Sequence, residues 1–565
     1  MKKILSVLLV ISQLSLFAQK NYPKDYFGKP LAVPIILSGT FGELRNNHFH
    51  AGLDIKTQQR DGLDVLATAD GFVSRIRVAL WGYGNVIYVN HPNGYTTVYA
   101  HLSKFNDTIS KYVRKIQYEK ESFETGNIFL KAGEIPVKKG DIIALSGSTG
   151  GYVPPHLHYE IRDTKSENII NPLFFGLEIT DTKSPSINAI ISYPIDETSR
   201  INNSNSKSIL AITKVDENNY KTSTVAAYGK IGFGIGVYDQ FNDGYNKNGI
   251  FSLEMTVNGS RVYYHDLETF TFAESKYINL LIDYPYYQDF DKRFQKTYKV
   301  EGNKLTIYQD LIDKGIIEVK NGLNYSVKII AKDYAGNTAT LTIPVSGKES
   351  NAIFSKPKDS TNYKIDRKKF NKFTKENVTI AFPKNTFYED FYMDFKIKDK
   401  VASIHKPTLP LDKNFTLIFN VSSYSADERK QLYIANINNK RYPRYQNTRK
   451  RDTIFYTTTK TLGEYTLKTD NKPPKIYVLD FGNEQWITNY TTITVKIDDE
   501  DSGIKDYRAT INDEWILMEY NLKKKQLTYN FSDKKLVGNK HIFKLVVSDN
   551  VDNTNFIERT FYRKP

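Results

Sequence analysis

The sequence predicts a mainly β protein of several domains, in which an N-terminal antiparallel β-sheet domain is followed by about three β-sandwich modules. The chain has 565 residues, too many for one core, so roughly three to five domains are expected. Aromatic residues make up 13% of the chain, 40 of them Tyr, and β-branched residues are frequent, which favours strands over helices. Short apolar runs separated by glycine turns also recur along the chain.

Residues 1–19 predict a signal peptide. The start, MKKILSVLLVISQLSLFAQK, has two lysines, an apolar run through Ala18 broken only by Ser and Gln, and then polar sequence. Because this run is too short and too interrupted to span a bilayer, cleavage near Ala18 or Gln19 is expected. No later stretch reaches the roughly 20 apolar residues of a membrane helix. The mature protein is therefore expected to be exported without a transmembrane segment, to the periplasm or cell envelope or into the medium.

Composition excludes several kinds of chemistry. There is no cysteine, so disulfides, a thiolate nucleophile and cysteine metal ligands are ruled out, and any metal must be held by His, Asp or Glu. The formal net charge is +15, which would draw an exported protein to anionic surfaces such as a cell wall or lipid headgroups. The basic residues are scattered among acidic ones, as on an ordinary solvated surface, and no nucleic-acid motif is present. Nucleic acid is therefore not an expected partner.

The first domain is expected over residues 20–177, with its core over 35–177. Short strands such as GFVSRIRV and NVIYVNH alternate with glycine turns there. A helical insertion at about 107–128 interrupts this pattern. We expect a packing helix, and the alternative is a lip on a substrate groove. Four apolar residues share its helical spacing: Ile109, Tyr112, Val113 and Ile116.

Three further β modules are predicted, an immunoglobulin-like sandwich at 178–347, a β-rich middle domain at 348–469 and a second immunoglobulin-like sandwich at 470–565. The middle domain would follow a linker, SKPKDSTNYK. The two immunoglobulin-like modules share a strand and turn, KIIAKDYAGN in the first and KLVVSDNVDN in the last, and each has an acidic turn upstream, GVYDQFNDG or VKIDDEDSG.

Aspartate and asparagine recur at the same offset in these turns. We expect them to cap turns between strands, and calcium binding is the alternative. The shared residues are Asp333 and Asn337 in the first copy and Asp549 and Asn553 in the second.

Six of the nine histidines fall between residues 48 and 158. The segment HLH places His156 and His158 on one face of a strand, since residues i and i+2 point the same way. The other members of the group are His48, His50, His91 and His101, and HFHAGLDI adds Asp54. A zinc ion is the simplest explanation, because a catalytic zinc takes three His or carboxylate ligands and leaves one position for water. Two further imidazoles could then serve in proton transfer and oxyanion stabilisation, as hydrolysis of an amide requires.

Taken together, these motifs resemble the lysostaphin-type or LytM-like zinc endopeptidases, which cleave peptidoglycan. The resemblance covers roughly residues 35–177 and keeps the family's order: HAGLD, GLDVLATADGFV, GYGNVIYVNHPNGYTTVYAHLS, VKKGDIIALSGSTG and PHLHYEIR. It implies the family's antiparallel β-sheet fold, a duplicated hybrid motif. Two departures flank the expected cleft, the longer stretch around the helical insertion and the segment GGYVPP. They put the substrate preference in doubt and leave the site motifs intact.

The resemblance also implies roles for five residues. It assigns one Zn²⁺ to His50, Asp54 and His158, and catalysis to His101 and His156. The implied function is an exported zinc endopeptidase that hydrolyses peptide cross-links of peptidoglycan, such as a D-alanyl to diaminopimelate bond. The C-terminal sandwiches would bind, space or dock to a partner in the cell envelope.

Three residues near these motifs have other expected positions or roles. His48 is expected at the surface or behind the ligands, and His91 in a hairpin turn. Glu160 either orients an imidazole or is structural.

Two other functions are alternatives to the endopeptidase. One is a non-catalytic LytM-like regulator of another wall hydrolase, which the presence of all five site residues disfavours. The other is an adhesin or glycan binder with a structural metal, which the three-ligand set disfavours, since a structural zinc usually has four protein ligands.

Overall fold

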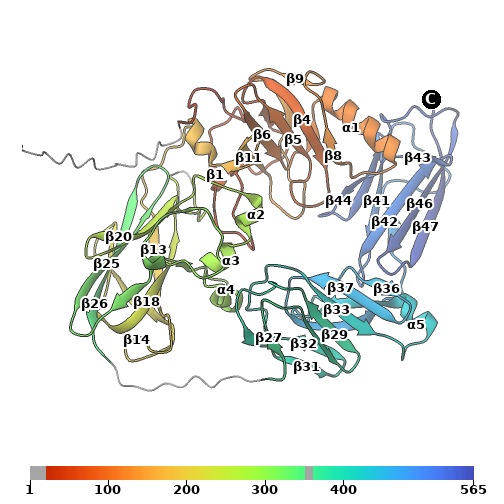
Figure 1. Ribbon diagram of the computed structural model, residues 1–565. Helices are drawn as coiled ribbons and strands as arrows, with labels where there is room; N and C mark the ends of the chain where they lie inside the picture. The colour runs from red at the N-terminus through yellow and green to blue at the C-terminus, as the bar shows by residue number, and fades with distance from the viewer. Residues whose placement is uncertain (1–20, 243, 350–360, 565) are drawn as a thin grey trace, which may run out of the picture.

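The computed structural model describes residues 21–242, 244–349 and 361–564. The predicted signal peptide, 1–19, lies outside these residues. Residues 355–360 of the predicted linker, which spans 355–364, also lie outside them. The predicted fold class is confirmed, because the chain forms one β-sheet domain followed by β-rich modules (Figure 1).

Four domains follow one another around a closed ring (Figure 1). The first and second share a hydrophobic core, and the fourth returns to contact the first. Polar contacts at the other junctions and at the closure join Lys276 to Asp412, Tyr433 to Asp501 and Arg114 to Asp533.

The first domain is built on an open antiparallel sheet of order β1-β2-β11-β6-β5-β4-β8. Strand β11 lies between β2 and β6, and all its residues but the last are buried, since it is covered on both sides. A smaller sheet of order β3-β10-β7 packs beside it. The strands of the main sheet are β1 (Leu37–Gly39), β2 (Leu53–Lys56), β4 (Gly71–Val78), β5 (Val86–Asn90), β6 (Tyr95–Ala100), β8 (Gly126–Phe129), β9 (Pro136–Val137), β11 (His156–Asp163) and β12 (Ile169–Ile170), and those of the smaller one are β3 (Asp64–Leu66), β7 (Lys104–Phe105) and β10 (Ile142–Leu145).

The helical insertion forms α1 (Asp107–Lys120). The Asn106 side chain caps its N-terminus by accepting from the backbone N–H of Ile109, and Glu121 ends it in a left-handed conformation. The helix is shorter than the predicted insertion, 107–128, because the chain turns back and pairs with β4 as β8. Its buried residues face the first domain, as expected of a packing helix, whereas Tyr118 makes an edge contact with Trp515 of the fourth domain.

The second domain contains a long strand, β18 (Val225–Tyr238), which pairs with strands of both halves of a 13-stranded sheet. The other strands are β13 (Ser186–Pro194), β14 (Arg200–Ile201), β15 (Ser208–Leu210), β16 (Ile212–Lys214), β17 (Asn219–Thr222), β19 (Ser252–Val257), β20 (Ser260–Asp266), β22 (Gln295–Lys296), β23 (Tyr308–Leu311), β24 (Ile317–Val319), β25 (Asn324–Lys332) and β26 (Thr338–Gly347). Its immunoglobulin-like character stays a prediction.

A segment of the second domain completes the core of the first. Strand β21 (Thr269–Phe270) pairs with β12 and so extends the first domain's sheet. The ring of Phe270 packs against Phe41 and Phe49, at centroid distances of 4.7 and 5.2 Å. Three short helices follow, α2 (Phe272–Ser275), α3 (Ile278–Leu281) and α4 (Tyr284–Phe290). The core of the first domain therefore extends beyond residue 177, where the sequence analysis ended that domain.

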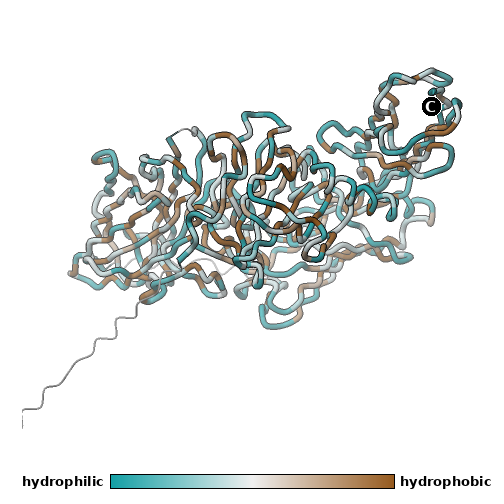
Figure 2. The backbone as a smooth tube through the Cα atoms, turned by 90° about the horizontal axis from the view of Figure 1, so that it is seen from above, coloured by the Kyte–Doolittle hydropathy of each residue, from teal (hydrophilic) through white to brown (hydrophobic). Residues whose placement is uncertain are grey.

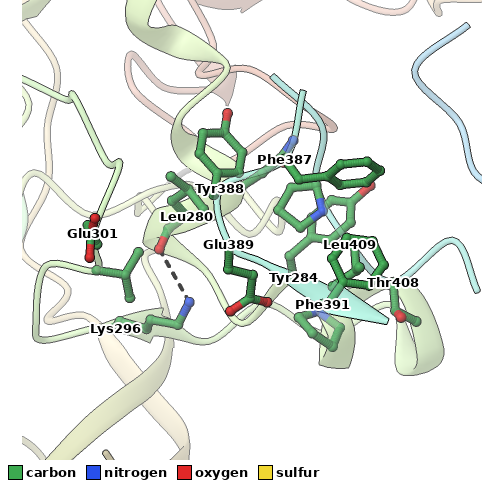
Figure 3. A pocket seen from close by; sticks show the side chains of 14 residues that line it. Leu280, Tyr284, Lys296, Glu301, Phe387, Tyr388, Glu389, Phe391, Thr408 and Leu409 are labelled. Carbon is green, nitrogen blue, oxygen red and sulfur yellow. Dashed lines mark hydrogen bonds between the residues drawn. The ribbon is translucent and has the colours of Figure 1, made fainter. Parts of the chain in front are cut away.

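Residues of the second and third domains line an open pocket of about 340 Å³ (Figure 3). It is lined by aromatic and apolar side chains from both domains and by Lys296, Glu301 and Glu389. The Lys296 ammonium donates to the carbonyl oxygens of Leu280 and Ile282, at 3.3 and 2.8 Å. Burial lowers the pKa of Lys296 to about 8.

The third and fourth domains each enclose one core between two sheets. Hydrophobic and hydrophilic stretches alternate along the chain, and many of the outer turns are hydrophilic (Figure 2). The third domain contains β27 (Lys364–Ile365), β28 (Asn371–Lys375), β29 (Val378–Phe382), β30 (Phe391–Tyr392), β31 (Phe395–Lys398), β32 (Val401–Ile404), β33 (Phe415–Asn420), α5 (Ala426–Gln431), β34 (Leu432–Asn436), β35 (Arg444–Tyr445), β36 (Arg449–Arg451), β37 (Ile454–Thr459) and β38 (Gly463–Thr469). The fourth contains β39 (Lys475–Val478), β40 (Gln485–Trp486), β41 (Thr492–Asp498), β42 (Ile504–Ile511), β43 (Glu514–Trp515), β44 (Glu519–Asn521), β45 (Gln526–Asn530), β46 (Lys540–Asp549) and β47 (Thr554–Tyr562).

Among the described residues, no helix has both the length and the apolar character needed to cross a bilayer.

Candidate metal centre and active site

The site lies on one face of the first domain's sheet, where β2, β11 and the end of β6 meet. His158 on β11 stands directly opposite Asp54 on β2. Because residues i and i+2 of a strand share a face, His156 stands beside His158. On the other side of β11, His158 pairs with Ala100, the last residue of β6, so His101 follows at the edge of the same site.

Three of the five predicted residues converge on one point. The Oδ1 atom of Asp54 lies 2.9 Å from Nε2 of His50 and 3.0 Å from Nδ1 of His158, and these two nitrogens are 3.1 Å apart. A tetrahedral zinc ion with bonds of about 2.0–2.1 Å separates its ligand atoms by roughly 3.3 Å. The spacing and the donor types therefore fit one such ion, and all three side chains are buried.

The remaining nitrogens of the two histidine ligands are held by hydrogen bonds. His50 donates through Nδ1 to the carbonyl oxygen of Thr40 at 2.7 Å, and His158 donates through Nε2 to Glu160 at 2.8 Å. These bonds fix which nitrogen of each ring faces Asp54, as is usual around metal-binding histidines. Glu160 thus makes the contact expected of a residue that orients an imidazole.

Buried charges around Glu160 determine the protonation of His158. Burial opposes ionisation of Glu160, but Arg162 and the hydrogen bonds from His158 and Tyr83 outweigh it and lower its pKa to about 2. Burial also disfavours the charged form of His158, yet its hydrogen bonds to Asp54 and Glu160 raise its pKa to about 9. Without a metal, His158 therefore carries a proton at neutral pH.

His101 and His156 form the second half of the site. They donate through Nδ1 to the carbonyl oxygens of Thr149 and Pro154, both at 2.8 Å, so Nε2 is the atom each ring has left for chemistry. The ring centroids are 4.6 Å apart, and Nε2 of His156 is 3.4 Å from Oδ1 of Asp54. Burial, together with the neighbouring imidazoles, lowers the pKa of His101 to about 3, so this ring is neutral at physiological pH.

A close contact between two loops holds His101 in place. The His101 backbone, at a φ of 61°, donates to the carbonyl of Tyr83 at 2.9 Å. Beside it, Gly84 and Gly150 approach so closely that a Cβ on Gly84 would lie 2.3 Å from Oγ1 of Thr149. The glycines of GYG and of GSTGG therefore allow the loop that carries Thr149 to reach the site.

The structure adds residues that the sequence analysis did not single out. Arg45 binds the second oxygen of Asp54, with Nη2 to Oδ2 at 2.9 Å. Tyr83 and Arg162 both bind Glu160. Arg162 follows HLHYE at alternate spacing on β11, so strand periodicity could have identified it, whereas Arg45 and Tyr83 reach the site from loops.

The two histidines expected outside the site do lie outside it. His48 is exposed and binds the carbonyl oxygen of Asn46, so it is not part of the metal group. His91 is buried in its hairpin turn between the carbonyl oxygen of Asp70 and the hydroxyl of Thr97.

Two histidines and a carboxylate form a donor set that suits a metal ion, and two further imidazoles lie beside it. Sequence comparison agrees, since residues 48–119 match Peptidase family M23. The N-terminal domain is a LytM-like domain of this family, as the sequence predicted. A second match, to the Zu5-like domain, covers residues 362–470, the third domain of the ring.

Curated relatives match part of the chain. An uncharacterized metalloprotease of Haemophilus influenzae is 36% identical over 133 residues, which cover 24% of this chain and 22% of that protein. The DD-carboxypeptidase/endopeptidase Mpg of Neisseria meningitidis is 35% identical over 113 residues, 20% of each chain. The murein hydrolase activator NlpD of Escherichia coli is 37% identical over 134 residues, 24% of this chain and 27% of that one. The chain thus spans only about a fifth to a quarter of the length of these relatives.

Solved structures also match part of the chain. The catalytic domain of lysostaphin from Staphylococcus simulans is 25% identical, covering 26% of this chain and 93% of that one, with a TM-score of 0.20. The catalytic domain of the M23 protein EnpA from Enterococcus faecalis is 23% identical, covering 28% and 98%, with a TM-score of 0.19.

Proposed function

We propose that this protein is an exported zinc endopeptidase that hydrolyses peptide cross-links of peptidoglycan. The observation that carries the proposal is the convergence of all five predicted residues on one face of the sheet, with three donor atoms spaced to hold one metal ion and two imidazoles beside them. A purely structural zinc would usually have a fourth protein ligand.

His50, Asp54 and His158 would hold the ion. When bound, zinc supplies Lewis-acid polarisation of the scissile carbonyl and lowers the pKa of a water molecule to about 7. The second oxygen of Asp54 is held by Arg45, and the outer nitrogens of both histidines are hydrogen-bonded. The three ligands are therefore oriented before a metal arrives, which favours binding.

The other two histidines carry the proton chemistry. His101 is neutral at physiological pH, and its Nε2 can accept a proton from the attacking water. His156 presents Nε2 beside Asp54. In its doubly protonated form the ring can donate from this nitrogen to the oxyanion that develops on the carbonyl. The hydrogen bonds at Nδ1 orient both rings and leave Nε2 of each one available.

The substrate we propose is a murein peptide, with the D-alanyl to diaminopimelate cross-link as the bond cut. Relatives whose names include a DD-carboxypeptidase/endopeptidase and a peptidoglycan DD-endopeptidase support this class. The formal charge of +15 also suits an anionic cell wall.

Digestion of purified murein by the mature full-length chain tests the proposal. We expect mass spectrometry to show cross-linked muropeptides converted to monomers, with loss of this activity after chelation and its return with added zinc. A zinc-loaded protein that yields no cleavage product would contradict the proposal and favour a regulator of another hydrolase.

A further inference from the structure

A cluster of three aspartates lies in the second domain, away from the candidate active site. Each offers one carboxylate oxygen, and these oxygens all lie within 4.8 Å of one another. Asp181 comes from the segment that enters the domain, Asp239 follows β18, and Asp333 follows β25. Three carboxylates so close together repel one another unless a proton or a cation compensates.

Oxygen atoms at this cluster lack hydrogen-bond donors. Asp239 is only 1% exposed, and its Oδ1 has no partner. Asn248 is 3% exposed, and its Oδ1 also lacks a partner. The backbones of these two residues exchange hydrogen bonds of 2.9 and 2.8 Å across an antiparallel bridge, so their side chains share a face. The Oδ2 atom of Asp181 is a third buried oxygen without a donor.

Positive charge near the cluster is sparse. In the part of the chain that the structure describes, no ion pair involves any of the three carboxylates. Lys183 is the nearby base, but its ammonium donates to the carbonyl oxygens of Phe241 and Asn242. Burial, and then the charges of Asp181 and Asp333, raise the pKa of Asp239 to about 8. A buried carboxylate with an oxygen that lacks a partner is costly to keep charged without a cation.

The fourth domain repeats the arrangement. Its cluster consists of Asp470, Asp499 and Asp549, again with carboxylate oxygens within 4.8 Å of one another. The entering segments read TDTKSP in the second domain and TDNKPP in the fourth, with Asp181 and Asp470 at the same position.

The turns in the two clusters also have the same hydrogen bonds. Asn337 donates through Nδ2 to Asp333 and to the backbone oxygen of Asp181, and Asn553 does the same to Asp549 and Asp470. Each asparagine thus ties its turn to the entering segment. The hydroxyl of Ser502, whose backbone N–H donates to Asp470 at 3.0 Å, also lacks a partner although the residue is buried.

We propose that each cluster binds one calcium ion. Carboxylate and amide oxygens are the ligands that calcium prefers, and it tolerates an irregular set of six to eight of them completed by water, whereas magnesium demands a near-ideal octahedron. The predicted turn capping by Asp333 and Asp549 is confirmed, since both accept backbone N–H groups. Turn capping and cation binding are compatible, because a carboxylate offers about four acceptor positions.

The position of the two sites suggests what the ions do. Asp181 lies just after the first domain, and Asp470 lies between the last strand of the third domain and the first of the fourth. Each ion would therefore join the incoming segment to two loops of the domain that it enters. Calcium would fix the orientation of two of the junctions in the ring.

Calcium titration of the full chain tests the proposal, with three variants. We expect calorimetry on calcium-depleted wild-type protein to show about two equivalents bound, one per cluster. Asp239→Asn and Asp499→Asn should each bind one equivalent fewer. Asp216→Asn is the matched control, because Asp216 caps a turn of the second domain outside the cluster. It should bind the same amount as the wild type.

Thermal unfolding provides a second measurement. Calcium at about 1 mM should raise the midpoint for the wild type, and less so for Asp239→Asn. Without calcium, Asp239→Asn should melt no lower than the wild type, because the raised pKa keeps Asp239 largely protonated at neutral pH and a neutral amide of similar shape replaces it. No calcium binding by the wild type would overturn the proposal, and full binding by either cluster variant would overturn the site that it alters.

Discussion

Lys523, in the fourth domain, donates through Nζ to the carbonyl oxygen of Ser148 in the first domain, 3.0 Å away and 375 residues earlier in the chain. The same ammonium group also binds the carbonyl oxygen of Val153. One side chain of the last domain thus holds both ends of the loop that precedes β11.

This loop orients the two catalytic histidines of the proposed mechanism. The carbonyl oxygen of Thr149, next to Ser148, accepts from His101, and that of Pro154, next to Val153, accepts from His156. The closure of the ring therefore reaches the active site through the backbone of a single loop.

We expect Lys523→Ala to slow turnover of soluble muropeptides by about 3- to 10-fold. The loop that orients His101 and His156 would lose its hydrogen bonds to the fourth domain, and small displacements of catalytic groups lower the reaction rate. The zinc content should not change, since the side-chain hydrogen bonds of the three described metal ligands go to residues outside this loop. Lys524→Ala, a neighbouring exposed lysine, is the control and should behave as the wild type. Equal rates for both variants would show that the loop holds its shape without the fourth domain.

His158→Ala should lose both zinc and activity, because it removes one of three ligands and leaves two that hold the ion poorly. Elemental analysis and muropeptide turnover, measured on the same preparation, check this expectation. Near-stoichiometric zinc in this variant would remove His158 from the ligand set.

His156→Ala should keep its zinc and lose on the order of 10²-fold or more in rate, the usual effect of removing a positioned acid, base or oxyanion donor. His101→Ala should behave in the same way. His48→Ala is the control, since His48 binds only its local backbone, and it should change little. Zinc loss in His156→Ala together with retention in His158→Ala would reverse the two assignments.

Zinc affinity should increase with pH. In the metal-free protein the pKa of His158 is raised to about 9, so below that pH zinc must displace a proton from the ring. The proton therefore competes less as the pH rises, and the affinity should increase about tenfold per pH unit between pH 7 and 9. Titration against a chelator of known pH dependence measures this slope. An affinity that is already constant from pH 7 would contradict a protonated His158.

A fragment of residues 20–177 should be much less stable than one of residues 20–347. The shorter fragment lacks β21 and uncovers Phe41 and Phe49, which pack against Phe270. Exposing each large apolar side chain costs about 1.5–3 kcal/mol. Thermal unfolding followed by circular dichroism compares the two fragments. Equal midpoints would mean that the first domain closes its core at residue 177 after all.

Much of the site could be predicted from local sequence. The spacing of His156 and His158 on a strand, and of His50 and Asp54 in HAGLD, indicated a shared face and a metal-binding donor set. Strand and turn patterns likewise indicated the β-rich modules. These features depend on residues close together in the chain, whose relative positions the backbone geometry of strands and turns already restricts.

Other features depended on which distant segments pack together. The pairing of β21 with β12, the contact between α1 and the fourth domain, and the bond from Lys523 to Ser148 join residues about 100 to 400 positions apart. No periodicity encodes such contacts, because they arise when whole domains bury complementary surfaces.

The sequence by itself therefore determined the fold class, the family of the first domain and the residue types available to hold a metal. The tertiary structure decided which ring nitrogens face that metal, which charges set the pKa of His158, and how the fourth domain reaches the active-site loop. The physical reason is that hydrogen bonds and buried charges act over a few ångströms in space, whatever the distance along the chain.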